Sequence, residues 1–152
     1  MVNNYEDTLE FIKICHDGQY YGEKEYWHHC VSVSEHGSEF FQDDWSEAAN
    51  IAALLHDVIE DTEYNHFDLV KKGYTWDIVY IVSLLTKDKS LSYEKNIKKI
   101  INSGNRDAMM VKYADNYVNF TGDKSKWNKS KKMKSQAKYA KSMNMLLEAL
   151  YE

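Results

Sequence analysis

The sequence predicts an all-α protein, a bundle of roughly seven or eight helices. Apolar residues recur every three to four positions through most of the 152 residues, and the Val- and Ile-rich segments follow the same spacing instead of the alternation typical of strands. The chain contains no proline, and its turn residues fall between these segments. A chain of this length is expected to form a single domain, residues 1–152.

Three helices are expected in the N-terminal part. The first begins near residue 4 and ends before Gly18. The second spans residues 25–36 and should stop at Gly37, because glycine readily takes the left-handed conformation past a helix end. Residues 44–47, Asp-Trp-Ser-Glu, have the form of a capping box that opens the third and most apolar helix. Its inner face should comprise Ala48, Ile51, Ala52, Leu55 and Ile59.

Five further helices follow the same reasoning. They are expected at residues 65–72, 75–85, 91–102, from 105 through 118, and at about 131–151. The helix from residue 105 carries Asp115 in the middle of an otherwise apolar stripe, where a carboxylate needs a partner. The last helix turns apolar residues inward and lysines outward.

Charge is unevenly distributed along the chain. The net charge is -5, yet residues 124–141 hold eight lysines and no acid, so an anionic ligand is not excluded. A nucleic-acid partner is not favoured, because this stretch lacks interleaved Arg and Gly, and Trp127 and Tyr139 are too few and too far apart to form a stacking platform.

The sequence favours a cytoplasmic protein without a membrane partner. Its start lacks the basic and apolar regions of a signal peptide, and its apolar runs are only a few residues long. Cys15 and Cys30 form no CxxC pair, so we expect free, buried thiols instead of a disulfide framework or a thiolate zinc site.

The chemistry is concentrated at the end of the third helix, where His56, Asp57, Glu60 and Asp61 follow an apolar run. Burying unpaired charge there would cost several kcal/mol by rough estimate, so something must neutralise these groups. A divalent cation would do so. His56 and Asp57 lie about 100° apart around a helix, so both could reach one ion between them.

Two ligands do not complete a metal site. The other candidates are His29, within Tyr-Trp-His-His, and Asp115, within Lys-Tyr-Ala-Asp, because both lie on inward faces of predicted helices. His28 is interpreted as a surface neighbour, and His16 and Gln19 as a hydrogen-bonding pair at a helix end.

At these motifs the chain resembles the HD superfamily of metal-dependent phosphohydrolases, most closely the alarmone hydrolase domain of the RelA/SpoT family. The resemblance spans roughly residues 9–141. Its elements, in order, are His16-Asp-Gly-Gln19, Tyr26-Trp-His-His29, Ala52-Ala-Leu-Leu-His-Asp-Val-Ile-Glu-Asp-Thr62, Thr86-Lys87, Lys112-Tyr-Ala-Asp115 with Asn119, and Tyr139-Ala140.

The resemblance implies an HD-domain helical bundle in which His29, His56, Asp57 and Asp115 bind the metal. Two imidazoles and two carboxylates suit Mn²⁺, with Fe²⁺ or Mg²⁺ as alternatives. Glu60 and Asp61 would be the acid–base pair beside the ion.

Substrate contacts are implied at three further positions. Asn119, one turn past Asp115, would hydrogen-bond a ribose or phosphate. Lys24 and Lys112 are candidates for phosphate contacts, and surface positions are the alternative for both.

The chain departs from the family where guanine nucleotides are held. Residues 19–26 are one residue shorter than the family pattern and contain Tyr20 and Tyr21 where a basic Arg-Lys pair is typical. Asn116 and Thr121 replace two arginines, and Arg106 is the only arginine in the chain. The reaction class is therefore better supported than the substrate.

Three functions remain open from the sequence. The first is hydrolysis of a nucleotide phosphate, with the 3′-pyrophosphate of (p)ppGpp as the leading substrate. The second keeps the site but acts on a nucleoside mono- or triphosphate or on NADPH. The third is a non-catalytic nucleotide- or partner-binding module. A homo-oligomer is compatible with the sequence, and the composition would fit a virus or mobile element acting in a host cytoplasm.

Overall fold

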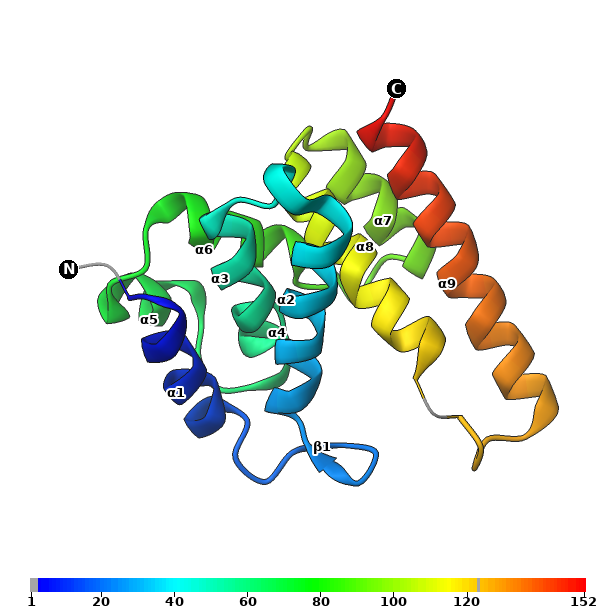
Figure 1. Ribbon diagram of the computed structural model, residues 1–152, viewed down its shortest axis with the longest axis horizontal. Helices are drawn as coiled ribbons and strands as arrows, with labels where there is room; N and C mark the ends of the chain where they lie inside the picture. The colour runs from blue at the N-terminus through cyan, green and yellow to red at the C-terminus, as the bar shows by residue number, and fades with distance from the viewer. Residues whose placement is uncertain (1–2, 123) are drawn as a thin grey trace.

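Figure 1 shows the computed structural model, which describes residues 3–122 and 124–152. Helices dominate these residues, so the predicted all-α class is confirmed. The elements are α1 (Tyr5–Cys15), β1 (Tyr20–Tyr21), β2 (Lys24–Glu25), α2 (Trp27–Phe41), η1 (Gln42–Asp44), α3 (Glu47–Leu55), α4 (Val58–Asp61), α5 (His66–Lys72), α6 (Trp76–Leu85), α7 (Tyr93–Asn102), α8 (Arg106–Thr121) and α9 (Lys129–Leu150). The two strands pair as a short antiparallel hairpin.

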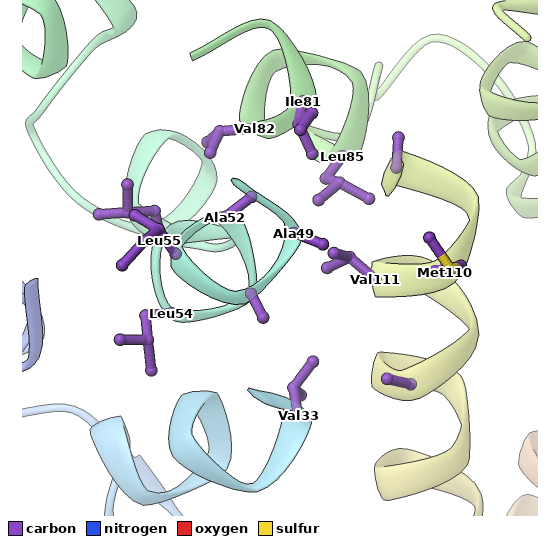
Figure 2. Packing of buried hydrophobic residues seen from close by; sticks show 14 of the residues in the cluster. Val33, Ala49, Ala52, Leu54, Leu55, Ile81, Val82, Leu85, Met110 and Val111 are labelled. Carbon is purple, nitrogen blue, oxygen red and sulfur yellow. The ribbon is translucent and has the colours of Figure 1, made fainter. Parts of the chain in front are cut away.

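Helix α3 is the centre of the hydrophobic core. Its residues from Ile51 to Leu55 are all buried. Side chains that surround it in Figure 2 are Val33 of α2, Ile81, Val82 and Leu85 of α6, and Val111 of α8. A helix that is apolar on all sides is stable only when other elements cover it. The C-terminal end of α3, which leads into His56, therefore lies inside the molecule.

Helices α8 and α9 form an antiparallel pair at one side of the bundle (Figure 1). The guanidinium of Arg106, at the start of α8, donates a hydrogen bond of 2.6 Å to the carbonyl of Leu150 at the end of α9. Apolar residues Leu146 and Leu150 are buried, whereas residues 129–134 at the start of α9 are exposed. One end of α9 is thus anchored in the core, and the other presents its lysines to solvent.

The predicted end of the second helix at Gly37 is wrong, because α2 continues to Phe41. Gly37 is buried in the helix, and the indole of Trp45 packs against its Cα. A Cβ at this position would lie 2.5 Å from Cζ2 and 2.6 Å from Cζ3 of that ring, and closer still to Cη2. The glycine provides space for an aromatic side chain and does not terminate the helix.

Gly37→Ala should therefore destabilise the protein, although alanine is the better helix former. Overpacking costs about 1–3 kcal/mol, against a gain in helix propensity of about 1 kcal/mol. In a Trp45→Ala background the same change should become neutral or stabilising, because the clash is gone. Urea unfolding of the four proteins measures this double-mutant cycle. An equal effect of Gly37→Ala in both backgrounds would contradict the packing interpretation.

The N-cap of the central helix also differs from the prediction. Asp44 ends the short 3-10 helix η1, and Ser46 caps α3 by accepting a hydrogen bond of 2.9 Å from the backbone N–H of Ala49. Trp45 is extended (φ -80°, ψ 100°), so the chain turns toward α3 two residues later than expected. This extended residue is the one whose indole fills the space beside Gly37.

None of the helices within residues 3–122 and 124–152 combines the length and the apolar character needed to cross a membrane. Both cysteines are free thiols. Cys30 is buried, as predicted, whereas Cys15 is only half-buried.

Candidate metal centre and active site

Three distant segments bring four side chains together beneath the hairpin. His29 comes from the first turn of α2, His56 and Asp57 from the junction of α3 and α4, and Asp115 from the middle of α8. His29 Nε2 lies 3.0 Å from Asp115 Oδ1, and His56 Nε2 lies 2.9 Å from Asp57 Oδ2 and 3.3 Å from Asp115 Oδ1. The structure therefore gathers all four residues predicted as metal ligands into one cluster.

The third helix does not continue through His56, contrary to the sequence-based expectation. Helix α3 ends at Leu55 and the single turn α4 begins at Val58. His56 Nδ1 lies 2.6 Å from the carbonyl oxygen of Ala53, within the last turn of α3. Because a carbonyl oxygen only accepts, Nδ1 carries the proton of this hydrogen bond. Nε2 is thereby directed toward the carboxylates.

Strong electrostatic coupling links the buried groups. Burial alone would lower the pKa of His56, but the attraction of Asp57 and Asp115 outweighs burial and raises this pKa well above its ordinary value. Burial alone would raise the pKa of Asp115, but Lys112 and His56 hold it well below its ordinary value. The pocket therefore keeps carboxylates ionised and must supply positive charge to balance them.

This arrangement fits a divalent cation. His56 Nε2 is buried and makes no hydrogen bond of good geometry, although two carboxylate oxygens lie within 3.3 Å of it. A neutral His56 would direct the lone pair of Nε2 at these oxygens, and the electron pairs would repel one another. A cation between them would accept all of these electron pairs as ligands. Side-chain atoms of His29, His56 and Asp57 all lie within 4.8 Å of one another. Nitrogen and carboxylate donors without thiolate suit Mn²⁺, Fe²⁺ or Mg²⁺.

Two tyrosines beside this cluster were not predicted as site residues. The hydroxyl of Tyr26 donates a hydrogen bond to Asp57 Oδ2. The ring of Tyr21 stacks on His29, with centroids 4.5 Å apart, and its hydroxyl donates to Asn119 Oδ1 over 2.9 Å. The spacing of three between Tyr26 and His29 could have indicated the first contact, because such residues share a helix face.

Tyr26→Phe should weaken metal binding by about 10- to 100-fold, because the hydroxyl orients Asp57 and partners of metal-bound carboxylates typically contribute this much. Isothermal titration with Mn²⁺ measures the change in Kd. Tyr20→Phe is a matched control, since this neighbouring tyrosine is exposed. An unchanged Kd in Tyr26→Phe would show that the hydroxyl does not orient the ligand.

Glu60 and Asp61 lie on α4 at the edge of the cluster. Glu60 Oε1 accepts a hydrogen bond of 2.7 Å from the backbone N–H of Lys87. Carboxylate oxygens of Asp57, Glu60 and Asp61 lie within 4.8 Å of one another. Partial burial and the charges of Asp57 and Glu60 raise the pKa of Asp61 to about 6. Both predicted acid–base residues are therefore next to the predicted ligands.

The end of α4 is held in place by the predicted helix-end pair. His16 Nδ1 lies 2.9 Å from Gln19 Oε1, as expected for these two residues. Gln19 Nε2 continues the chain of contacts by donating 2.8 Å to the backbone carbonyl of Asp61. This pair thus supports the acidic turn without offering a side chain to the cavity.

A cavity of about 240 Å³ opens directly above the cluster. Of the three predicted substrate contacts, Asn119 and Lys112 line it and Lys24 does not, since Lys24 lies on the exposed strand β2. Lys112 Nζ lies 3.3 Å from Asp115 Oδ2, and Asn119 Nδ2 donates 3.3 Å to Asp115 Oδ1. Both predicted substrate-contacting side chains therefore also contact the carboxylate of Asp115.

Several further cavity residues lie outside the predicted set of site residues. Lys87, Tyr93, Lys138 and Tyr139 line the opening and come from segments after α6 and from α7 and α9. Lys138 Nζ lies 4.7 Å from the ring centroids of both tyrosines. Lys87 and Tyr139 carried a signal, through the Thr-Lys and Tyr-Ala pairs of the resemblance. Lys138 carried none, because one lysine of a lysine-rich helix looks like any other.

Comparison with known families decides the class of this site. The profile of the HD domain matches residues 26–149, which include all four clustered side chains. The chain belongs to the HD domain family. As an HD domain with this His/Asp cluster, it is a metal-dependent phosphohydrolase that uses a divalent metal. The predicted family and enzyme class are confirmed.

A solved structure agrees with this HD fold. It is described as a metazoan ortholog of SpoT that hydrolyses ppGpp and plays a role in starvation responses. The two chains share 24% sequence identity and superpose with a TM-score of 0.71. The alignment covers 95% of this chain and 90% of the other. No curated protein sequence matches this chain.

Proposed function

We propose that this HD domain hydrolyses the 3′-pyrophosphate of (p)ppGpp. The observation that carries the proposal is the location of Glu60 and Asp61 beside the four-residue cluster, at the base of one cavity. The similar fold of a protein described as hydrolysing ppGpp supports the choice of substrate. So does the resemblance of the site motifs to alarmone hydrolases.

His29, His56, Asp57 and Asp115 are proposed to hold the metal, with Mn²⁺ as the first candidate. When bound, such an ion lowers the pKa of a water ligand and polarises a phosphoryl oxygen. The fixed Nδ1 hydrogen bond of His56 and the Tyr26 hydroxyl on Asp57 orient two of these side chains before binding. The protein thereby avoids part of the cost of ordering the site.

Glu60 and Asp61 are proposed to manage proton transfer. The Lys87 amide fixes Glu60 through Oε1, so its carboxylate keeps one orientation relative to the cluster. Asp61 lies beside it, and its backbone is held by Gln19. One carboxylate takes a proton from the water as the water oxygen bonds to the phosphorus attached at the 3′ position. The bond from that phosphorus to the 3′-oxygen breaks, and the carboxylate pair returns the proton to the departing 3′-oxygen. The products are pyrophosphate and a guanosine 5′-phosphate.

Lysines are proposed to stabilise the substrate's negative charge. Lys87, Lys112 and Lys138 line the cavity from three different segments. They act as point charges, without the bidentate geometry of the arginine clamps that are typical of the family and absent from this chain. The lysines can still neutralise the phosphate charge, but they select less strongly than arginine for groups that accept two parallel hydrogen bonds.

Tyr20 and Tyr21 favour a second candidate, hydrolysis of another nucleotide such as a nucleoside triphosphate or NADPH. They occupy the stretch where the family has its basic pair, and Tyr21 lies against His29 and Asn119 inside the site. A site altered here could accept a base other than guanine.

Product analysis separates the candidates. Purified protein loaded with Mn²⁺ is incubated with ppGpp, nucleoside mono- and triphosphates and NADPH, and pyrophosphate and orthophosphate are measured separately. The leading proposal predicts pyrophosphate and GDP from ppGpp, with activity lost in EDTA and restored by Mn²⁺. If another nucleotide releases orthophosphate while ppGpp stays intact, the leading proposal is wrong and the second candidate is supported.

A further inference from the structure

A second groove lies beside the active-site cavity, along the exposed face of α9. It has a volume of about 520 Å³ and is lined by Trp127, Lys131, Lys134, Ser135, Lys138 and Tyr139, among others. Lys138 and Tyr139 also line the active-site cavity, so the two hollows meet at these side chains. A ligand that extends out of the catalytic cavity past Lys138 would enter this groove.

The groove is positively charged. No carboxylate belongs to its lining. Within the described part of the chain, no acid pairs with Lys131, Lys134 or Lys138, whereas Lys141, on the same helix, pairs with Glu94 at 2.7 Å. Three like charges that share one groove repel one another, and an anion bound between them removes this repulsion.

Aromatic rings hold two of these lysines in place. Lys131 Nζ lies 4.3 Å from the ring centroid of Trp127, and Lys138 Nζ lies 4.7 Å from that of Tyr139. Cation–π contacts of this kind limit the rotamers of long side chains. The groove thus offers cations whose positions are restrained.

The length of the charged track limits the size of the ligand. Lys131 and Lys138 are seven residues apart on α9, which is about 10 Å at 1.5 Å per residue. This distance is comparable to one nucleoside phosphorylated at both ends. Sites for single-stranded nucleic acid commonly extend over about 4 or more nucleotides, which a track of this length would not cover.

We propose that Lys131 and Lys134 bind the second phosphate group of a substrate that carries phosphates at two separated positions. The scissile group lies at the His/Asp cluster, the nucleoside passes Lys138 and Tyr139, and the distal phosphates reach the groove. This inference rests on the proposed function, because it assumes that a nucleotide is the substrate. In this proposal, the first part of α9 distinguishes nucleosides with phosphates at two positions from nucleosides with phosphates at one position.

Kinetics with two substrates test the inference. In the Lys131→Glu/Lys134→Glu variant, KM for ppGpp should rise by about 10-fold or more with kcat nearly unchanged, since each removed phosphate contact weakens binding and two new repulsions are added. Guanosine 3′-diphosphate, which lacks distal phosphates, should show no such change. Lys129→Glu/Lys132→Glu is the matched control, because both residues are exposed on α9 and lie outside the groove lining. Equal effects on both substrates would overturn the inference.

A binding measurement separates failure of this inference from failure of the proposed function. If the parent protein hydrolyses no ppGpp, inorganic tripolyphosphate is titrated calorimetrically into the parent and both double variants. Binding that is lost only in Lys131→Glu/Lys134→Glu supports an anion site in the groove. The inference is wrong if the parent protein does not bind tripolyphosphate. It is also wrong if a single-stranded dodecanucleotide binds through Lys131 and Lys134 while tripolyphosphate does not bind.

Discussion

Asp57→Asn is expected to reduce phosphohydrolase activity by about 10³-fold or more. The metal's stabilisation of the transition state is worth several kcal/mol, and 1.36 kcal/mol corresponds to tenfold in rate. Asp57 is one of only two carboxylates in the proposed ligand set and lies 2.9 Å from His56 Nε2. An amide keeps the shape of the side chain but removes the charge that balances the ion.

Metal affinity and activity should be lost together in this variant. Calorimetric titration with Mn²⁺ and a pyrophosphate-release assay measure the two effects on the same preparation. Asp43→Asn is the control, because Asp43 is exposed in η1, at the opposite end of α2 from His29. If Asp57→Asn binds Mn²⁺ and turns over substrate like the parent, the proposed metal centre is wrong.

Glu60→Gln and Asp61→Asn are expected to lower kcat by about 10²- to 10⁴-fold, the usual contribution of a positioned acid or base. In contrast to Asp57→Asn, both variants should retain the Kd for Mn²⁺ within a few-fold, since neither residue belongs to the proposed ligand set. Each substitution keeps the size of the side chain, and the amide oxygen introduced by Glu60→Gln could still accept the hydrogen bond from the backbone N–H of Lys87.

Glu63→Gln is the matched control for this pair, because Glu63 is exposed just beyond α4. A weaker Kd or a lower number of bound ions in Asp61→Asn would contradict the acid–base role. It would instead indicate that Asp57, Glu60 and Asp61, whose oxygens lie within 4.8 Å of one another, hold a metal themselves.

The convergence of His29, His56, Asp57 and Asp115 could be predicted because it depends on local patterns. His29 and Asp115 lie on inward faces of α2 and α8, and inward faces of a small bundle share one interior. His56 and Asp57 directly follow the buried end of α3. A buried charge in such a place needs an opposite charge or a bound ion as its partner. The folded protein places His29 Nε2 and Asp115 Oδ1 3.0 Å apart.

The role of Gly37 could not be predicted, because its local signal has two meanings. Glycine after a helical segment indicates a C-terminus, but it also leaves space for a neighbouring side chain. Only the position of Trp45 decides between them, and that indole reaches Gly37 through an extended residue and a 3-10 turn. Because Asp44 belongs to this 3-10 turn, the N-cap of α3 is Ser46 and not the predicted Asp44.

The positions of Lys24 and Lys138 relative to the cavity could not be predicted from the sequence either. Lys24 was a candidate for a phosphate contact, but it lies on the exposed strand β2 of the hairpin. Lys138 lines the cavity because α9 folds back antiparallel along α8, which the periodicity of α9 alone does not show. Local patterns locate the buried part of a site better than its solvent-exposed rim.

His29 and Asp115 are 86 positions apart in the chain, and the helices that carry them are joined by most of the remaining fold. An ion held by both would act as a reversible cross-link across this span, comparable in topology to a disulfide that closes a long loop. Thermal melting of this protein would then report binding of the ion, because an ion that binds only the native state stabilises it by an amount that grows with the ratio of free-ion concentration to Kd.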